Sequence, residues 1–557
     1  MRTNPNIKLI SIPEELREIA YYTTPSMLKK YQDFHWPPID LLNREKPPEV
    51  DSSVVGSLFA RSLLAKVSLY NTNNPPGEYG RLFAKVDHPG VEIVPGCLSK
   101  KRIPRHLSPD ELEARAKYQR QTLIFWNKAK LPSPRFVGFS EHEVLVKGKK
   151  IAEEQKAYAL VMQRIDAPSH DRDLLAINRT IEDYQAGLED RLLGADHQRS
   201  TVLNISELHE EKSRIVRSIM NTQIRCQLLG TYHLDDLAQE VDGAPYEIHS
   251  SEDYIREAQL CVSHYLRAFN LYQQLVAKPT PTISLQNAQN DHFPWKQWLT
   301  HQRTVRAFQK AFQPFFEELY SDERSFRYIH GDAYPHNYAG RFMREGVVEF
   351  LEQDLGMQSV MFSPNRAKRG LPEEDLSKLL ISPILDLKPS DIDLFVKEYH
   401  AHQLATAKSM ARGKKGRPGI ESLITSFTSE ELVDRVDCML MKIAIEMLGL
   451  KGKDEIFNKK VYETIRTKLH PYDLSNSLVR FPESTIPESV PTKPNQVYFT
   501  PYATANTFEH VTHLVKARMD SFLTRERENN NPYTSLKQPM RTLRELFDKH
   551  LTFPKQD

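Results

Sequence analysis

Two polar residues lie five positions apart in one short stretch, and their types and spacing could support group transfer. Asp332 and Asn337 follow Tyr328 and Ile329, an apolar pair typical of the end of a strand. An Asp followed five residues later by an Asn is the spacing of a catalytic loop for phosphoryl transfer. In such a loop the Asp accepts the proton of an attacking hydroxyl and the Asn binds magnesium. We therefore predict that Asp332 and Asn337 are catalytic and that Asn337 is a metal ligand.

A second carboxylate follows another apolar run further along the chain. Residues 347–351 read Val-Val-Glu-Phe-Leu, and Glu352 and Asp354 come directly after them, before Leu355-Gly356. A strand that ends in a carboxylate and a glycine-containing turn is where a kinase keeps its main metal-binding Asp. Asp354 is the predicted ligand because Leu-Gly follows it. Glu352 is the alternative, since alternation along the strand could direct its side chain into the cleft instead.

Together these segments resemble the aminoglycoside phosphotransferase and choline kinase family of the protein-kinase-like superfamily. The resemblance is carried by His330-Gly331-Asp332, then Asn337, then Asp354-Leu355-Gly356. This family has His-Gly-Asp in the loop where most protein kinases have His-Arg-Asp. The resemblance implies an α+β, two-lobed protein-kinase-like fold. A small β-rich N-lobe and a large, mainly helical C-lobe are expected, with N- and C-terminal extensions.

The elements of the N-lobe would have to hold the nucleotide. Residues 51–90 alternate between strand-like runs and turns, and Lys85 lies inside the apolar run 82–86. A lysine inside an apolar strand is costly to bury without a partner, so the bland alternative is an edge strand with an outward lysine. The resemblance implies that Lys85 holds the α- and β-phosphates of ATP. Gly56 and Ser57 would form the turn over the phosphates, although no Gly-x-Gly-x-x-Gly motif is present.

A helix is predicted next, because Ser-Pro-Asp-Glu at 108–111 supplies an N-cap, a first-turn proline and two first-turn acids. In the family this helix carries a Glu that pairs with the strand lysine. Glu113 is the predicted partner of Lys85, unless it is simply a solvated acid near the helix N-terminus. Glu111 is a second candidate, and counting back from the prolines that follow places the family position near Gln119.

The strand over 157–166 runs into a linker, which the resemblance makes the adenine-binding hinge. Gln163 and Ile165 are the predicted contacts, on the basis of position alone. The predicted division of the chain is an N-terminal extension (1–50), the N-lobe (51–165), the C-lobe (166–470) and a C-terminal linker and helical extension (471–557).

The C-lobe is predicted to be helical, apart from the catalytic and metal segments. Helices are expected over 180–195, 206–232, 251–277, 293–320, 372–380, 389–407 and 428–449, and two more over 507–527 and 534–551. Residues 357–371 are expected to be irregular, and the basic stretch 408–418 to be a solvated loop. Asp375 matches an Asp-Leu motif of the family, whose Asp braces the catalytic loop by hydrogen bonds.

Composition restricts the class of protein. Lys plus Arg number 75 against 73 Asp plus Glu, so charge gives no argument for nucleic acid or membrane binding. The four cysteines are far apart and form no C-x-x-C pair, which suits a reducing compartment. No signal peptide is evident, and no apolar run approaches the roughly 18–20 residues that span a bilayer. We expect a cytoplasmic protein without a membrane span.

The function these features predict is transfer of the γ-phosphate of Mg-ATP to a hydroxyl of a small molecule, with ATP and Mg²⁺ as cofactors. In regulated protein kinases the loop Arg pairs with a phosphorylated activation segment, and Gly331 cannot do so. Only about 19 residues separate Asp354 from the helix near Glu373, too few for a peptide-docking platform. The alternatives are an atypical protein kinase and a pseudokinase or nucleotide-binding scaffold. The acceptor and the oligomeric state are not predicted.

Overall fold

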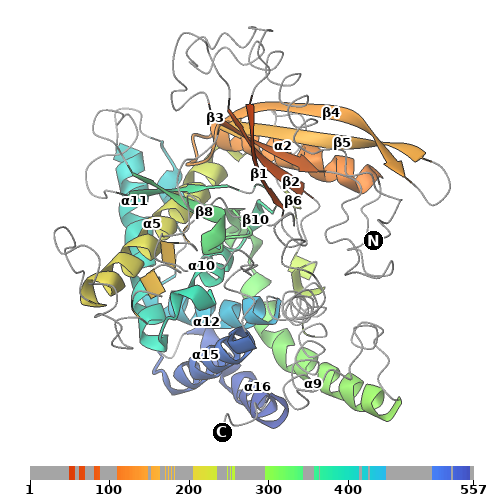
Figure 1. Cartoon of the computed structure of the whole chain (residues 1–557). Helices are drawn as coiled ribbons and strands as arrows, with labels where there is room; N and C mark the ends of the chain where they lie inside the picture. The colour runs from red at the N-terminus through yellow and green to blue at the C-terminus, as the bar shows by residue number, and fades with distance from the viewer. Residues whose placement is uncertain are drawn as a thin grey trace, which may run out of the picture. The chain divides into compact units, whose positions relative to one another are not determined.

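A computed structural model gives the fold (Figure 1). With short internal gaps, the structure describes residues 49–56, 62–68, 81–87, 109–147, 152–163, 205–234, 247–248, 295–342, 357–446 and 505–551, together with single positions within 170–181 and 251–262. The described residues up to Gln163 belong to one compact unit, and those from His170 onward to another. The predicted domain boundaries and the two-lobed arrangement remain predictions.

The first unit is built on one antiparallel sheet of five strands. Its strands are β1 (Glu49–Gly56), β2 (Ser62–Ser68), β3 (Arg81–Asp87), β4 (Phe136–Lys147) and β5 (Ala152–Gln163). Their order is β1-β2-β3-β5-β4, so β3 is the central strand. Lys85 on β3 lies opposite Leu160 on β5. The edge-strand alternative for Lys85 is therefore wrong.

Helix α2 (Pro109–Lys128) packs on β4 and β5. Its buried face includes Leu112, Ala116, Leu123 and Trp126, at the spacing of an amphipathic helix. Asn127 fastens the end of the helix to β4. Its Oδ1 accepts the Phe136 N–H at 2.5 Å and its Nδ2 donates to Pro134 O at 2.8 Å.

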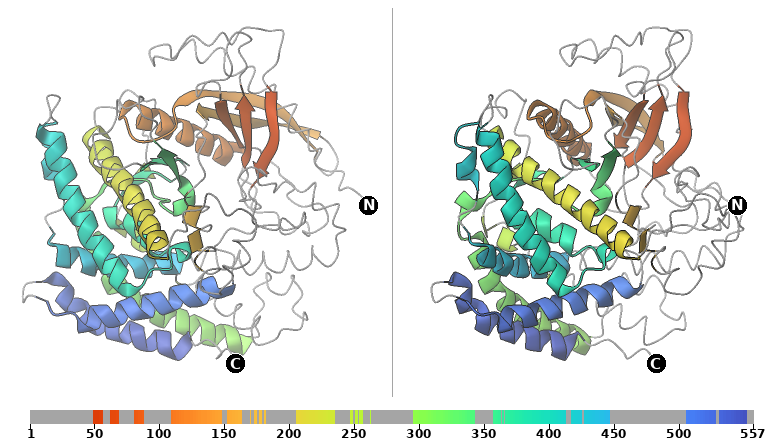
Figure 2. Two further views of the ribbon diagram at one scale, coloured as in Figure 1. Left: turned by 60° about the vertical axis from the view of Figure 1, so that its left-hand side comes forward. Right: turned by 90° about the vertical axis from the view of Figure 1, so that its left-hand side faces the viewer.

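The second unit is mainly helical. Its helices are α5 (Ile205–Tyr232), α9 (Trp295–Tyr320), α10 (Pro372–Leu380), α11 (Pro389–Arg412), α12 (Ser429–Glu446), α15 (Ala505–Thr524) and α16 (Lys537–His550). Figure 2 shows α5, in yellow, alongside α11, and α15 and α16, in blue, beside α9. These helices agree with the predicted ones to within a few residues, except that α11 continues to Arg412 and so includes the first residues of the stretch 408–418 that was expected to be a loop.

Two short sheets in this unit differ from the prediction. Strand β9 (Met357–Met361) pairs with β8 (Tyr338–Phe342), and β10 (Lys368–Gly370) lies between β6 (Glu247–Ile248) and β7 (Arg327–Ile329). The expectation that residues 357–371 are irregular is therefore wrong for 357–361 and 368–370. β9 and β10 are only five and three residues long, and pairing with other strands rather than their own composition makes them strands.

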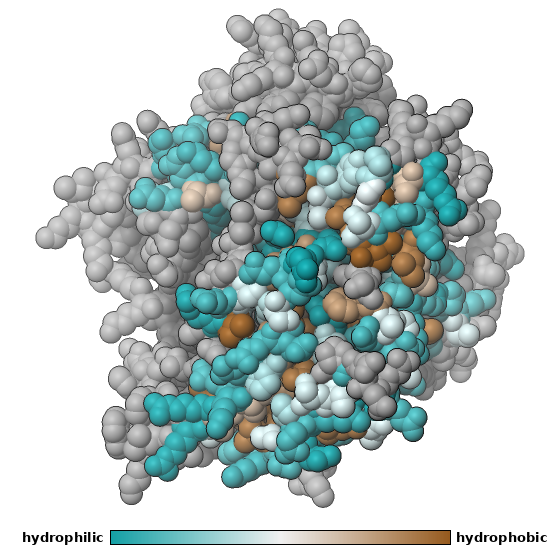
Figure 3. Space-filling model, turned by 180° about the vertical axis from the view of Figure 1, so that it is seen from behind, coloured by the Kyte–Doolittle hydropathy of each residue, from teal (hydrophilic) through white to brown (hydrophobic). Residues whose placement is uncertain are grey.

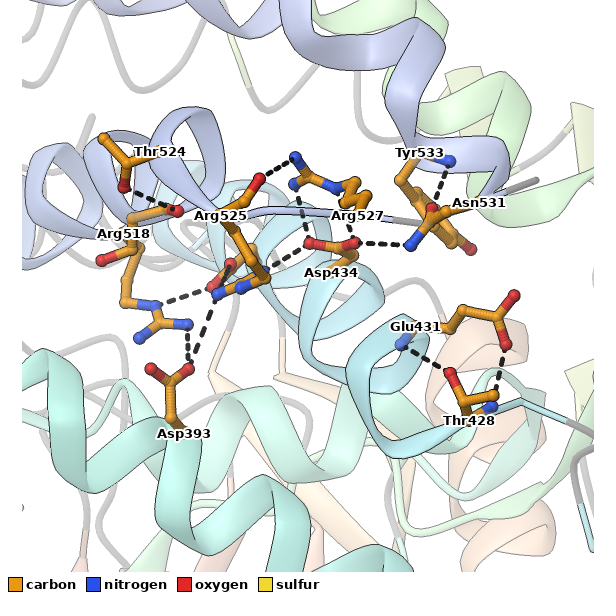
Figure 4. A network of polar contacts seen from close by, with 12 residues as sticks. Asp393, Thr428, Glu431, Asp434, Arg518, Thr524, Arg525, Arg527, Asn531 and Tyr533 are labelled. Carbon is orange, nitrogen blue, oxygen red and sulfur yellow. Dashed lines mark hydrogen bonds and ion pairs between the residues drawn. The ribbon is translucent and has the colours of Figure 1, made fainter. Parts of the chain in front are cut away.

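The hairpin of α15 and α16 is joined to α12 and α11 by buried ion pairs (Figure 4). Asp434 accepts hydrogen bonds from Arg525, Arg527 and Asn531, which lie at and beyond the end of α15. Arg518 donates from Nε to Asp437 and from Nη2 to Asp393, at 2.7 Å in both cases. The described part of the predicted C-terminal extension, from residue 505 onward, thus packs against the helical unit.

The described surface is mostly hydrophilic on the face drawn in Figure 3, with small hydrophobic patches. Among the described residues, Leu394 is the only large hydrophobic residue that is exposed, at 51%. Within that part of the chain, no helix has the length and hydropathy needed to cross a bilayer.

Candidate functional site

The predicted catalytic loop lies between β7 and β8. A 3-10 turn over Pro335–Asn337 ends the loop and folds Asn337 back toward Asp332. Asn337 Nδ2 donates to the backbone oxygen of Asp332 at 2.6 Å and to its carboxylate Oδ2 at 3.0 Å. Asn337 is buried and Asp332 is half-buried. The structure therefore brings the two predicted catalytic side chains into direct contact.

This contact also fixes which way the Asn337 amide faces. The amide nitrogen must meet the two oxygens of Asp332, so the amide oxygen faces away from them. Oδ1 of Asn337 accepts no side-chain hydrogen bond from any described residue. An amide oxygen beside a carboxylate is the hard oxygen donor set that suits Mg²⁺. No cluster of three His, Cys, Asp or Glu residues that could hold a metal occurs within the described part of the chain.

Asp375 holds the backbone of the loop from helix α10. Its two carboxylate oxygens accept the N–H groups of His330 and Gly331, at 2.8 and 2.9 Å. The hydrogen bonds predicted for Asp375 are thus confirmed. Burial raises the pKa of this carboxyl above its usual value, while the His330 N–H and the Lys378 ammonium act in the opposite direction. Because each oxygen accepts an N–H, the ionised form is the one that fits.

His330 links the loop to the chain beyond β9. Its Nδ1 accepts the Asp332 N–H at 3.2 Å, and its Nε2 lies 2.9 Å from Phe362 O. With Nδ1 accepting, Nε2 is the ring nitrogen placed to donate to Phe362 O. The backbone on the amino side of Asp332 is thereby held from β9 as well as from α10.

Gly331 has a backbone conformation that favours glycine, with φ at +75°. A Cβ on this residue would lie 1.9 Å from the backbone oxygen of Arg366. No larger side chain fits there unless the backbone moves. The arginine that most protein kinases carry at this position is therefore incompatible with this loop as it stands.

The structure describes two of the three residues of α2 that were considered as the partner of Lys85. Glu113 is half-exposed and pairs with Lys117 at 2.5 Å, and this contact lowers the pKa of Glu113. Gln119 is 1% exposed and lies on the α2 face that packs on the sheet. The side chains of Lys85 and Glu111 lie outside the description. Of the described candidates, Gln119 has the buried position expected for the family's Glu, but its amide cannot neutralise a lysine.

The other predicted nucleotide and metal residues are described in part or not at all. Gly56 and Gln163 are the last residues of β1 and β5, and the structure gives only their backbone. Ser57, Ile165 and both metal-ligand candidates, Asp354 and Glu352, lie outside the described residues. Their roles remain predictions.

Sequence reasoning missed one further contact with the loop. The Nζ of Lys378, one turn along α10 from Asp375, donates to the backbone oxygen of Gly331 at 2.6 Å. The available signal was the run of charged residues at 373–375, followed by Lys378, in a short helix. Every residue of α10 is buried, and buried charges require partners.

Comparisons with known proteins gave only distant matches. No family model and no curated protein sequence matches the chain. Among solved structures, an ethanolamine kinase from Plasmodium vivax is 9% identical, with 82% of this chain and 89% of that chain covered and a TM-score of 0.35. A choline/ethanolamine kinase family protein from Mesorhizobium loti is 10% identical, covering 93% and 100%, with a TM-score of 0.32.

A third solved structure is a spectinomycin phosphotransferase in complex with ADP and spectinomycin. It is 8% identical, with 84% of this chain and 96% of that chain covered and a TM-score of 0.36. The TM-scores and identities are low in all three cases, so the likeness is weak.

Proposed function

We propose that this protein is a phosphotransferase that moves the γ-phosphate of Mg-ATP to a hydroxyl of a small molecule. The observation that carries the proposal is the loop itself. Asp332 and Asn337 are in contact within a segment whose backbone is held by Asp375. Catalysis of phosphoryl transfer depends mostly on positioning and electrostatics, so a rigidly held carboxylate is the feature such an enzyme needs.

Asp332 is assigned the acceptor side of the reaction. One oxygen of its carboxylate receives the Asn337 amide, which fixes the orientation of the group. The carboxylate is half-buried, so it retains an accessible side. In the proposed role Asp332 accepts the proton of the attacking hydroxyl and directs the oxygen toward the phosphate.

The nucleotide side of the reaction would use the other residues that the sequence predicted. Asn337 Oδ1 and Asp354 would be ligands of Mg²⁺, which when bound offsets the negative charge of the phosphates. Lys85, on the central strand β3, would contact the α- and β-phosphates. The remaining nucleotide contacts of the proposal are Glu113, Gly56, Ser57, Gln163 and Ile165.

A small-molecule acceptor is supported by the tight packing at Gly331. The contact between Gly331 and the Arg366 backbone leaves no room for the arginine with which protein kinases read a phosphorylated activation segment. Together with the short segment between Asp354 and α10, this favours an acceptor smaller than a protein.

The first test is an acceptor screen that measures ADP release with Mg-ATP over sugars, amino alcohols and nucleosides. Asp332→Ala should lower kcat on the best acceptor by about 100- to 10,000-fold, the usual loss for a general base. Affinity for Mg-ATP should be retained, because Asp332 is assigned to the acceptor. Asp322→Ala, which changes an exposed Asp ten residues earlier, is the control and should retain activity.

Full activity of Asp332→Ala would show that the catalytic assignment is wrong. Robust phosphorylation of a generic protein, without activity on any small molecule, would point to an atypical protein kinase instead. Nucleotide binding without transfer to any acceptor would indicate a pseudokinase.

The metal assignment has a test of its own. Asp354→Ala should weaken Mg²⁺-dependent ATP binding more than Glu352→Ala, because only Asp354 is followed by Leu-Gly. Nucleotide titrations of both variants with and without Mg²⁺ measure this difference. The reverse order of effects assigns the ligand to Glu352.

A further inference from the structure

The ammonium group of Lys378 lies directly against the catalytic loop. Its Nζ donates to the backbone oxygen of Gly331 at 2.6 Å and to Glu374 Oε1 at 2.8 Å. The Lys378 side chain is 2% exposed and that of Glu374 is fully buried. A charge-assisted hydrogen bond in such surroundings is stronger than one between neutral groups. The contact therefore constrains the loop as well as satisfying the lysine.

Lys378 and Asp375 hold three consecutive peptide groups between them. Asp375 accepts the N–H groups of the two peptides that precede the Gly331–Asp332 bond. Lys378 binds the carbonyl of the next peptide, the one that joins Gly331 to Asp332. Residues three apart lie on one face of a helix, so a single turn of α10 presents both side chains to the loop.

We propose that Lys378 is a positioning residue, which sets the direction of the Asp332 carboxylate by fixing the Gly331–Asp332 peptide. This inference rests on the proposed function in so far as Asp332 is the proton acceptor. Gly331 has no Cβ, so its own backbone resists rotation of this peptide weakly. Without Lys378, this peptide would keep only the longer hydrogen bond from the Asp332 N–H to His330 Nδ1, at 3.2 Å, and Asp332 could turn away from its place beside Asn337. A displacement of about 1 Å at a reacting group can lower the rate about 100-fold.

A second buried lysine provides the control, because it shares the same carboxylate without binding the loop carbonyl. Lys368 Nζ lies 2.9 Å from the same Glu374 oxygen and 4.8 Å from the centre of the Tyr254 ring. Its ammonium makes no hydrogen bond to a residue of the described catalytic loop. Lys368→Met and Lys378→Met each remove one ammonium from Glu374 and leave the other in place. Both variants are therefore expected to fold and to lose similar stability.

The first measurement is steady-state kinetics of the two variants on the acceptor found by the screen. Lys378→Met should lower kcat by about 10- to 100-fold with KM for ATP little changed, since the effect is on orientation. Lys368→Met should retain most of kcat. Lys378→Arg keeps a cation of similar reach, and it should recover part of the loss.

The second measurement does not depend on activity. Amide hydrogen exchange over residues 328–338 should accelerate in Lys378→Met and stay near the unmodified protein in Lys368→Met. Equal exchange in the two variants overturns the proposal, because Lys378 would then act only as a partner of Glu374. If exchange differs but the unmodified protein transfers no phosphate to any acceptor, the loop contact stands and the proposed phosphotransfer fails.

Discussion

The loop depends on one residue without a side chain as much as on its polar groups. Gly331 combines a positive φ with close approach to the backbone of Arg366, and its N–H and carbonyl are both used, by Asp375 and Lys378. A side chain here would push against backbone rather than against a flexible group. The loop would then have to shift at the residue that precedes Asp332.

Gly331→Ala should therefore lower both stability and activity. The free energy of unfolding should fall by about 2–4 kcal/mol, from the left-handed backbone and the overpacking together. Denaturant unfolding and ADP release measure the two effects.

Gly419 is the matched control, since its φ is +83° and no atom lies within 4 Å of its Cβ position. Gly419→Ala should lose only about 1–2 kcal/mol, the backbone contribution. Equal losses would contradict the steric argument.

The sequence could indicate that Asp332 and Asn337 act together because they are close to one another in the chain. Asp332 and Asn337 are five residues apart, so their types and spacing sufficed. Lys378 and Gly331 are 47 residues apart, and no local pattern indicates that contact. The carboxylate partner of Lys85 was left open for a related reason, because the choice depends on which face of α2 packs on the sheet.

At the scale of elements, α10 is the helix that supports the loop. It begins with Pro372, which is favoured at the first position, and acids follow in its first turn. Each of its buried charges has a partner: Glu373 binds Arg435, Glu374 binds Lys368 and Lys378, and Asp375 binds the loop. The helix is thus held by ionic contacts on several sides.

Glu374 should make the stability of the protein depend on acidic pH. Burial opposes its ionisation, but Lys368, Lys378 and Lys442 hold its pKa well below the usual 4.5. An acid whose pKa is lowered by folding contributes stability that is present above its usual pKa and is lost as the pH falls through the lowered pKa. Glu374→Gln should therefore be less stable at neutral pH, by about 3 kcal/mol. As the pH falls below 4.5, its stability should decrease less than that of the unmodified protein.

Chemical unfolding at a series of pH values measures this difference. Glu211→Gln is the control, because Glu211 pairs with Arg214 on the surface. An exposed pair contributes at most about 1 kcal/mol, so this variant should follow the unmodified protein. If the free energy of unfolding fell equally steeply at acidic pH in the unmodified protein and in Glu374→Gln, the assigned role of Glu374 would be refuted.

Long helices were predictable and short strands were not. Apolar residues recur along α5, α9 and α12 with the period of a helix over many turns, so the pattern is strong. β9 and β10 have five and three residues, and tertiary pairing decides their conformation. The sheet of the first unit was predictable because its strands are longer and turn residues separate them.

At the scale of the whole molecule, the C-terminal helices α15 and α16 pack against helices that lie much earlier in the chain. Helix α16 packs on α9 through Phe547, which contacts Phe308 and Phe312. On the other side, Arg435 of α12 links Glu373 of α10 to the hydroxyl of Tyr533. Tyr533, between α15 and α16, is thus connected through one arginine to the helix that holds the predicted catalytic loop.

The ion pairs of the α15–α16 hairpin should differ greatly in their contributions to the free energy of unfolding. Asp434→Ala leaves buried Arg527 and half-buried Arg525 without their carboxylate and should cost about 3–5 kcal/mol. Asp520→Ala removes an exposed partner of Arg544 in the same hairpin and should cost at most about 1 kcal/mol. Thermal and denaturant unfolding compare the two. Similar losses would contradict the assignment of the Asp434 cluster as the main anchor.

The contact between Arg435 and Tyr533 has a consequence for biosynthesis. The two residues are 98 positions apart, so at about 5–20 residues per second a ribosome needs roughly 5–20 s to make the second after the first. During that interval the acids and arginine of α12 lack the partners that α15 and the following turn provide. Nascent chains stalled before residue 505 should therefore be cleaved readily by protease in the helical unit and should recruit chaperones, whereas released full-length chains should resist.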